Sequence, residues 1–490
     1  MNTSIRRIGV GIIVLLLALI AQLSYLQLIR ADKLTSDPRN FRVTRRDISR
    51  PRGAIITVDG VVIARTTPVK DDLKFQRTYP QGPLYAHITG FQSLLYGTSG
   101  LERSYDDALF GRNIEARLDD LSALLTPNTT SNVRLTVDSV AQNAAANALR
   151  GRRGSIVVLD TRTGGVVAMY SNPTFDPNRI ATHNDVAARK AYNQLTADPT
   201  NPMLWRAARE LFPPGSTFKV VSTAIALDAQ LVTPDTPFPV LRELDLPLTT
   251  RTLSNFGGAS CGGPLRDSFR KSCNTAFGQI GLDLGEQLVT GTERFGLNSS
   301  APPFDWSPGI VSSRGPLPGT FEKEQPQFAL DAIGQGDIAV TPLHMALVAE
   351  SVATGGIMRK PHLMSSIEDP NAPGTAIATA SPTTWRTVMK PDTAATLNEF
   401  MQLVVSNGTG TAAQLPGITV AGKTGTAQTR KGNAPHAWFI GFAPAQAPKY
   451  AIAVLIENDN NQNFEATGGK IAAPVARDVL AALFGARGTS

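Results

Sequence analysis

A serine followed three residues later by a lysine is the first pair in this sequence that could do covalent chemistry. Ser216 and Lys219 follow two prolines and a glycine, which end one segment, and an apolar helix is predicted to begin near Ser216. A hydroxyl at a helix N-terminus meets unpaired N–H groups and the positive end of the helix dipole, which favour developing negative charge. Because Lys219 lies about one turn further along the same face, its amine is expected to reach the Ser216 hydroxyl as a base.

The residues behind Lys219 predict that its amine is buried. They form an apolar helical face made of Val220, Val221, Ala224, Ile225 and Leu227. Burial and nearby positive charge both lower a lysine pKa, which favours the neutral, basic form of the amine. The alternative is a capped helix with a solvated lysine, since a serine and a lysine at this spacing also arise by chance.

Two further clusters of polar residues follow later in the chain. Ser272 and Asn274 are predicted to lie in a loop between helices, and a strand carries Lys423, Thr424, Gly425 and Thr426. Each cluster alone has a simpler interpretation, as a turn or as an exposed strand end. The three clusters together, in this order and with wide gaps between them, form a more specific pattern than any one of them.

The elements that must position these clusters are predicted to form one sheet with inserted helices. Strand patterns cover 155–159 and 166–170, after a helical pattern at 140–149. Later strands are predicted at 417–428, 437–442 and 450–456, with a helix at 469–484, whereas 180–415 is predicted to be mainly helix and loop. Early and late strands around a helical middle indicate a sheet whose strands come from both ends of the domain.

Residues 31–133 contain no cluster of catalytic residue types. Asp59-Gly60 between the apolar runs 54–58 and 61–64 predicts a β-hairpin, and the polar stretch 126–132 is typical of a linker. We therefore predict a pedestal or interaction domain at 31–133 and a catalytic domain at 134–490.

The segment 1–30 is predicted to form a cytoplasmic tip and a membrane anchor. The run from Ile8 to Leu28 has few polar interruptions and is long enough to span a bilayer. Arg6 and Arg7 precede it, which favours a cytoplasmic N-terminus and a body outside the cytoplasm. The alternative is a cleaved secretory signal, but the apolar run is long for one and no clean Ala-x-Ala follows.

Charge and composition argue against several classes of function. The 47 basic and 40 acidic residues give a formal charge of +7 without a dense basic run, so nucleic-acid binding is not predicted. The positive charge is compatible with a mild attraction to anionic membranes or wall polymers. The five histidines are scattered with no His-Glu-x-x-His motif. We predict neither a metal site nor a cofactor.

The two cysteines are predicted to form a disulfide. Cys261 and Cys273 lie close together in the sequence of a domain that is predicted to be exported, where an oxidising compartment allows a bridge. The bridge would tie the loop at 257–263 to the loop of Ser272. Two buried thiols are the alternative.

The three clusters, read as Ser-x-x-Lys, Ser-x-Asn and Lys-Thr-Gly, match the signature of penicillin-binding proteins and class A β-lactamases. The sequence resembles a class B penicillin-binding protein, most closely the actinobacterial penicillin-binding protein A type, over nearly its whole length. Besides the anchor and the clusters, the resemblance is carried by Arg52-Gly-Ala-Ile, Asp59-Gly60, Gly100-Leu-Glu, Leu135-Thr-Val-Asp, Gly334-Gln-Gly and Gly408-Thr-Gly. Cys273 replaces the Asp of the signature, at a position that varies in the family.

The resemblance implies a mixed α/β fold of the penicillin-binding, serine-transferase type. It implies a five-stranded antiparallel sheet flanked by helices, an all-helical subdomain, a small elongated N-terminal domain and one transmembrane helix. The activity implied is that of a peptidoglycan D,D-transpeptidase, which cross-links stem peptides ending in D-Ala-D-Ala and is acylated by β-lactam antibiotics. Its implied partners are the cytoplasmic membrane and glycosyltransferase, divisome or elongation proteins.

The resemblance also assigns roles to the clustered residues. Ser216 would attack the substrate carbonyl and Lys219 would take its proton, while Ser272 relays a proton to the departing amine. Asn274 would hold the substrate amide and Lys423 would keep the local potential positive. Thr424, Gly425 and Thr426 would bind an extended peptide as a further strand, with the threonine hydroxyls facing its carboxylate.

Two other functions use the same residues. A D,D-carboxypeptidase or β-lactamase would use water as the acceptor, but no Glu-x-x-x-Asn lies between Ser272 and Lys423 and the N-terminal domain is superfluous for hydrolysis. A wall-assembly scaffold or β-lactam sensor would not need all the reactive groups. A glycosyltransferase activity is not expected, because the roughly 100 residues ahead of the catalytic domain are too few for one.

Overall fold

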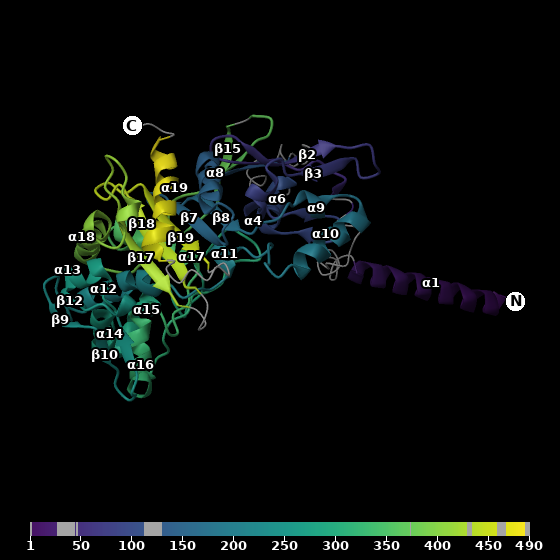
Figure 1. Ribbon diagram of the computed structural model, residues 1–490. Helices are drawn as coiled ribbons and strands as arrows, with labels where there is room; N and C mark the ends of the chain where they lie inside the picture. The colour runs from purple at the N-terminus through teal and green to yellow at the C-terminus, as the bar shows by residue number, and fades with distance from the viewer. Residues whose placement is uncertain are drawn as a thin grey trace.

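The computed structural model of the chain describes residues 2–26, 45, 48–111, 130–372, 374–428, 434–457 and 467–485 (Figure 1). Most of the predicted linker at 126–132 lies outside these residues. The two predicted strands at 155–159 and 166–170 and the three late strands lie within them, so the predicted sheet can be compared directly.

A five-stranded antiparallel sheet forms the centre of the catalytic part of the chain (Figure 1). Its strand order is β17-β18-β19-β7-β8, which confirms that early and late strands share one sheet. The strands are β7 (Gly154–Asp160), β8 (Val166–Asn172), β17 (Ala421–Ala427), β18 (His436–Ala443) and β19 (Tyr450–Ile456). Because β17 is an edge strand, one side of its backbone is not paired within the sheet.

The sheet is apolar on both faces. Side chains alternate across a strand, so Val157 and Leu159 join one buried cluster, whereas Ile156 and Val158 join another. A strand that is apolar at every position must be covered on both faces. This explains why the strand sequences read as continuous apolar runs.

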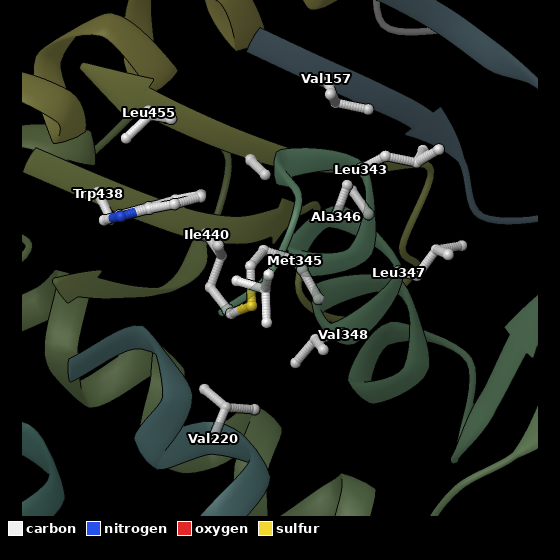
Figure 2. Packing of buried hydrophobic residues seen from close by; sticks show 14 of the residues in the cluster. Val157, Val220, Leu343, Met345, Ala346, Leu347, Val348, Trp438, Ile440 and Leu455 are labelled. Carbon is white, nitrogen blue, oxygen red and sulfur yellow. The ribbon is translucent and has the colours of Figure 1, made fainter. Parts of the chain in front are cut away.

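Helices cover the two faces of the sheet. The face of Ile156 packs against α8 (Ser139–Leu149) and α19 (Ala473–Gly485), which follows η6 (Gly468–Ala472). The opposite face packs against α11 (Arg206–Arg209) and α17 (Pro342–Ala353). Figure 2 shows Leu343, Met345 and Ala346 of α17 among the sheet residues Val157, Trp438, Ile440 and Leu455, whereas Val348 lies on the side toward Val220.

Most of the remaining helices come from the segment between β8 and β17. They are α9 (Asn178–Ala181), α10 (Asp185–Ala197), η3 (Gly215–Phe218), α12 (Lys219–Asp228), η4 (Phe256–Gly258), α13 (Leu265–Lys271), α14 (Asn274–Leu284), α15 (Glu286–Arg294), α16 (Phe321–Asp331), α18 (Pro391–Asn407) and η5 (Thr411–Ala413). Three two-stranded ribbons accompany them: β9 (Pro237–Leu241) with β12 (Cys261–Pro264), β10 (Glu243–Asp245) with β11 (Thr252–Ser254), and β13 (Ile357–Arg359) with β16 (Thr384–Thr387). All three ribbons lie within 180–415, which was predicted to be mainly helix and loop.

A second sheet, with six strands, lies in the N-terminal part of the chain. Its order is β15-β14-β6-β1-β2-β3, and the antiparallel pairing of β1 with β2 confirms the hairpin at Asp59-Gly60. The strands are β1 (Ile55–Ile56), β2 (Val62–Pro68), β3 (Phe75–Thr78), β6 (Asn132–Leu135), β14 (Met364–Glu368) and β15 (Ala376–Thr379). Around them lie η2 (Gly82–Leu84), α4 (Ala86–Thr89), β4 (Gln92–Ser93), β5 (Gly97–Thr98), α5 (Gly100–Ser104) and α6 (Asp106–Leu109).

Four strands of this sheet, β3, β6, β14 and β15, were not predicted. β14 and β15 fall within 180–415, which was predicted to be mainly helix and loop, and that prediction is wrong at these residues. β14 pairs with β6, which lies far earlier in the chain, so its pairing leaves no local signal. β6 itself runs across residue 133, where the boundary between the two domains was predicted. The position of this boundary stays a prediction.

Helix α1 (Asn2–Ser24) contains most of the predicted apolar run. Its segment Arg6–Ser24 has 19 residues and a mean hydropathy of 2.2, and none of it is buried within the protein. The helix is long and apolar enough to cross a bilayer. A signal sequence would have the same properties.

A buried ionic cluster joins the two motifs Arg52-Gly-Ala-Ile and Gly100-Leu-Glu. The Glu102 carboxylate accepts hydrogen bonds from Arg52 Nε and Arg77 Nε, both at 2.6 Å, and from the Tyr79 hydroxyl at 3.2 Å. Its side chain is fully buried. Burial alone would raise the Glu102 pKa, but Arg77 and Arg52 hold it below its ordinary value. The carboxylate is therefore charged, and two buried guanidinium groups share it.

The substitution Glu102→Gln is expected to destabilise the N-terminal sheet by about 3–5 kcal/mol, because Arg52 and Arg77 lose the buried carboxylate between them. The control Asp106→Asn removes a partner of Arg52 that is 30% exposed, and about 0–1 kcal/mol is expected. Urea unfolding measures both changes. A loss below about 1 kcal/mol for Glu102→Gln would contradict the assignment of the cluster as a structural centre.

Candidate active site

The turn that carries Ser216 is built between two proline residues and the edge of the central sheet. Ser216 lies in η3, just before α12 begins at Lys219, and its side chain is partly exposed. The Trp438 indole N–H donates to the Pro213 carbonyl at 3.0 Å, and the Gly215 N–H donates to the Gly334 carbonyl at 2.8 Å. The predicted helix start at Ser216 is thus confirmed, with a short 3-10 turn ahead of the α-helix.

Glycines let this turn approach β17 closely. Gly215 has φ +53°, and a Cβ built there would lie 2.7 Å from the Thr426 carbonyl oxygen. A Cβ on Gly425 would lie 2.7 Å from the Pro214 carbonyl oxygen. Both distances are too short for real side-chain atoms, so these positions require glycine. The consequence is that Ser216 lies directly beside the strand of the Lys-Thr-Gly cluster.

The Lys219 amine is fully buried and hydrogen-bonded to the second cluster. Its Nζ donates to the Ser272 carbonyl and to Asn274 Oδ1, each at 2.8 Å, and lies 3.4 Å from Ser272 Oγ. Both close partners are oxygens that can only accept. A neutral amine has two N–H groups, and these two partners use both, which leaves the lone pair for a hydroxyl.

Ser272 Oγ lies between two lysine amines. Lys423 Nζ donates to Ser272 Oγ at 3.0 Å and to the Thr424 carbonyl at 3.1 Å, while Lys219 Nζ lies on the other side. Because the hydroxyl accepts from Lys423, its own hydrogen is available to the Lys219 lone pair. The structure thus brings together two lysines and a serine that come from three separate segments of the sequence.

Burial sets the protonation of both lysines. It lowers the Lys219 pKa well below its ordinary value, and the neighbouring Lys423 charge lowers it further. Burial also lowers the Lys423 pKa to about 7. Each amine lies over an aromatic ring, at 5.1 Å from the Phe277 centroid for Lys219 and 5.6 Å from the Phe269 centroid for Lys423. A ring face favours the cation, so it is burial and the Lys423 charge that favour the neutral, basic form of Lys219.

The predicted contact between Lys219 and Ser216 is not formed as a hydrogen bond. Among the described residues, the amine is bonded to Ser272 and Asn274 only, and the Ser216 hydroxyl has no side-chain hydrogen bond. Catalytic hydrogen bonds in ligand-free sites are often long and tighten when substrate binds. The helical spacing places the lysine correctly but does not fix its rotamer.

The threonines of β17 differ in their surroundings. Thr424 is 6% exposed, and its hydroxyl is 2.6 Å from that of Thr409. Thr426 is partly exposed, and its Oγ1 accepts from the Gly468 N–H at a long 3.4 Å. The Thr426 hydroxyl is therefore the more accessible of the two. Thr409, from the Gly408-Thr-Gly segment, is a site residue whose role was not predicted.

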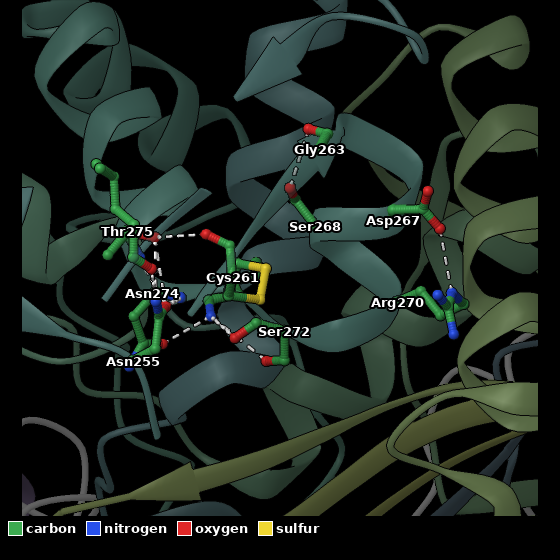
Figure 3. Close-up of a disulfide and its surroundings, with 12 residues drawn as sticks. Asn255, Cys261, Gly263, Asp267, Ser268, Arg270, Ser272, Asn274 and Thr275 are labelled. Atoms are coloured by element: carbon green, nitrogen blue, oxygen red, sulfur yellow. Dashed lines mark hydrogen bonds and ion pairs between the residues drawn. A yellow bond between two sulfur atoms is a disulfide. The ribbon is translucent and has the colours of Figure 1, made fainter. Parts of the chain in front are cut away.

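The disulfide between Cys261 and Cys273 is present, as predicted, with a Cα–Cα distance of 5.4 Å (Figure 3). It joins β12 to the residue between Ser272 and Asn274. Among the residues that the structure describes, no group of three or more His, Cys, Asp or Glu side chains could hold a metal ion.

The two lysines are expected to titrate at unusual pH values in protein carrying 13C-labelled lysine. The Lys423 signal should titrate near pH 7 and the Lys219 signal well below 10.5. Lys423→Met should raise the Lys219 pKa, because it removes a like charge, while burial still keeps that pKa below 10.5. The exposed Lys360→Met is the control and should leave the Lys219 signal unchanged. Ordinary lysine titration of both signals would refute the described electrostatics.

Comparison with known proteins agrees with this geometry. Residues 154–481 match the penicillin-binding protein transpeptidase domain, and residues 52–133 match the penicillin-binding protein A dimerisation domain. The peptidoglycan D,D-transpeptidase PbpA of Mycolicibacterium smegmatis is 40% identical, over 98% of this chain and 99% of that protein. The PbpA of Mycobacterium tuberculosis is 38% identical, over 98% and 99% of the two chains.

Solved structures give the same result. Penicillin-binding protein A from M. tuberculosis as a ceftriaxone acyl-enzyme superposes with a TM-score of 0.80 and 36% identity, covering 89% of this chain and 99% of that one. Its penicillin G acyl-enzyme has a TM-score of 0.79 and 37% identity, with the same coverage. The chain therefore belongs to the penicillin-binding protein transpeptidase family, and within it to the penicillin-binding protein A type.

Proposed function

We propose that this protein is a peptidoglycan D,D-transpeptidase that joins stem peptides through an acyl-enzyme on Ser216. The observation that carries the proposal is the buried Lys219 amine, whose two N–H groups are used by the Ser272 carbonyl and Asn274 Oδ1. Its lone pair remains for a serine proton. The relatives named as D,D-transpeptidases and the acylated M. tuberculosis protein support the same reaction.

In the first half of the reaction, Ser216 Oγ attacks the carbonyl carbon of the penultimate D-Ala. Its proton passes to Lys219 Nζ, whose neutral form is favoured because burial and Lys423 lower its pKa. The backbone N–H groups of Ser216 and Thr426 would stabilise the oxyanion, at about 3 kcal/mol for each donor. The close packing of Gly215 on Thr426 supports this pairing of donors.

Collapse of the tetrahedral intermediate breaks the bond to the terminal D-Ala. The leaving nitrogen needs a proton, and the Ser272 hydroxyl would give its own while Lys219 replaces it. Lys423, with a pKa of about 7, would keep the potential around Ser272 positive. The amine of a second stem peptide then attacks the ester, forms the cross-link and returns the proton to Ser216.

Edge strand β17 would bind the donor peptide as an added strand. Its free backbone edge offers main-chain hydrogen bonds, and Thr426 would face the peptide carboxylate with Thr424 beside it. Asn274 would hold the substrate amide through its side-chain NH₂ group, because its Oδ1 accepts from Lys219. A β-lactam presents a carboxylate and a strained amide in the same arrangement and would acylate the same oxygen.

Helix α1 would anchor the enzyme in the cytoplasmic membrane, with the N-terminus inside and the catalytic part outside. The support is its length and hydropathy, together with Arg6 and Arg7 ahead of the apolar run. An anchored enzyme would act beside a glycosyltransferase and the proteins of division or elongation. Residues 52–133, which match a dimerisation domain, would form the pedestal for such contacts.

A labelled penicillin should mark the protein stably and should not mark Ser216→Ala at all. Lys219→Ala should be labelled about 10²–10⁴-fold more slowly, because the general base is lost. Ser272→Ala should also be labelled more slowly than the original protein. Its effect should not simply add to that of Lys219→Ala, because groups that act as a unit are non-additive. Stopped reactions followed by intact-mass spectrometry and peptide mapping measure the rate and the site of the adduct.

Ser406→Ala is a matched serine control on the exposed surface of α18 and should be labelled at the rate of the original protein. An adduct on a residue other than Ser216 would overturn the mechanism. Mass spectrometry of stem peptides treated with the protein separates the remaining alternatives: cross-linked dimers indicate transpeptidation, whereas trimmed monomers alone indicate a hydrolase.

The anchor is tested by membrane fractionation with N-terminal sequencing of the mature protein. We expect the intact N-terminus in the membrane fraction, released by detergent and not by salt, because an apolar helix spans the bilayer. Replacing two central residues, Leu16→Arg and Leu17→Arg, should prevent insertion. A mature protein that begins beyond residue 20 and is free of membrane would mean that α1 is a cleaved signal.

A further inference from the structure

Helix α14 begins at a residue of the active site but has no cap of its own. Asn274 is its first residue, and the preceding Cys273 makes no side-chain cap hydrogen bond. The Cys273 sulfur is bonded to Cys261. The first N–H groups of a helix have no partner within the helix, so they need an acceptor from elsewhere.

Asn255 supplies this acceptor from a distant loop. It follows β11, and its Oδ1 accepts from the Asn274 N–H at 2.7 Å and from the Thr275 N–H at 3.1 Å (Figure 3). Its Nδ2 donates to the Leu241 carbonyl at 2.8 Å. The residue is only 6% exposed. Both ends of the amide are bonded, so its orientation is fixed.

The neighbouring residue fixes the side chain of Asn274. Asn274 Nδ2 donates to the Ser254 carbonyl at 3.0 Å, which turns Oδ1 toward Lys219 Nζ at 2.8 Å. If the amide were reversed, its Oδ1 would face the Ser254 carbonyl, and two acceptors would meet. The dipeptide Ser254-Asn255 thus holds both the backbone and the side chain of Asn274.

We propose that Asn255 is a positioning residue for acylation, acting through Asn274 on the Lys219 amine. This rests on the proposed function of Lys219 as a base. Asn274 Oδ1 takes one of the two N–H groups of neutral Lys219, and this directs the lone pair toward the serine hydroxyls. Loss of the Asn255 acceptor lets the first turn of α14 move, which displaces Asn274 Oδ1 from Lys219 Nζ. Displacements of about 1 Å at such a site typically cost about 100-fold in rate.

The first test is the second-order rate of acylation of the full-length protein by a chromogenic β-lactam. Asn255→Ala is expected to be about 10- to 100-fold slower. Asn184→Ala is the matched control, since Asn184 accepts from the Ala187 N–H as the N-cap of α10, away from the lysines. It should acylate at the original rate even where its melting temperature falls. An unchanged rate for folded Asn255→Ala would overturn the proposal, whereas failure of the original protein to acylate would overturn the proposed function itself.

A double variant separates positioning from a general loss of stability. If Asn255 acts through Asn274, the variant Asn255→Ala/Asn274→Ala should be no more than about twofold slower than Asn274→Ala alone. A merely structural role predicts that the two effects multiply. Multiplied effects would therefore overturn the proposal.

Asn255→Asp keeps the acceptor oxygen, loses the donor to Leu241 and to Thr275 Oγ1, and adds a negative charge, so it covers the case in which Asn255→Ala does not fold. The acylation rate of Asn255→Asp is measured across pH, because a pH profile distinguishes a shifted pKa from a lower maximal rate. The maximal rate should lie within a few-fold of that of the original protein. A maximal rate as low as that of Asn274→Ala would show that the oxygen does not position the site.

Discussion

The site depends on the burial of two lysine amines beside one serine hydroxyl. Lys219 and Lys423 have no exposed surface, and both are bonded to Ser272. Two buried cations at this spacing are unfavourable, so burial and mutual repulsion drive Lys219 toward its neutral form. The property that makes Lys219 a base is therefore produced by packing, and only a well-closed interior can maintain it.

The fold supplies that interior by joining distant parts of the chain. Lys423 comes from edge strand β17, Lys219 from the first turn of α12, and Ser272 from the junction of α13 and α14. The turn of η3 packs on β17 at glycine positions, so no side chain separates Ser216 from the strand. The central sheet and α12 thus supply the two lysines from regular elements, whereas the two serines lie in short turns beside them.

The sequence predicted the parts of this arrangement that have a local pattern. The helix start at Ser216, the strand at Lys423 and the shared sheet follow from prolines, glycines and apolar periodicity. It did not predict β14 and β15, or the cap from Asn255, because these are long-range contacts that leave no periodic signal. The sequence also could not predict the rotamer of Lys219, because helical spacing fixes the position of a Cα atom but not that of the side-chain amine.

Ser272 shows why several long-range contacts converge on one loop. It has φ +64°, a left-handed conformation that is uncommon for a residue with a side chain and typically costs about 1–3 kcal/mol. Such a conformation persists only where its surroundings enforce it. Here Lys219 holds its carbonyl, Lys423 holds its hydroxyl, and the disulfide fixes the next residue. Asn255 then fixes Asn274, the residue that follows. Because each residue of the strained loop is held by a neighbour, the Ser272 hydroxyl stays between the two amines without reorganisation during the reaction.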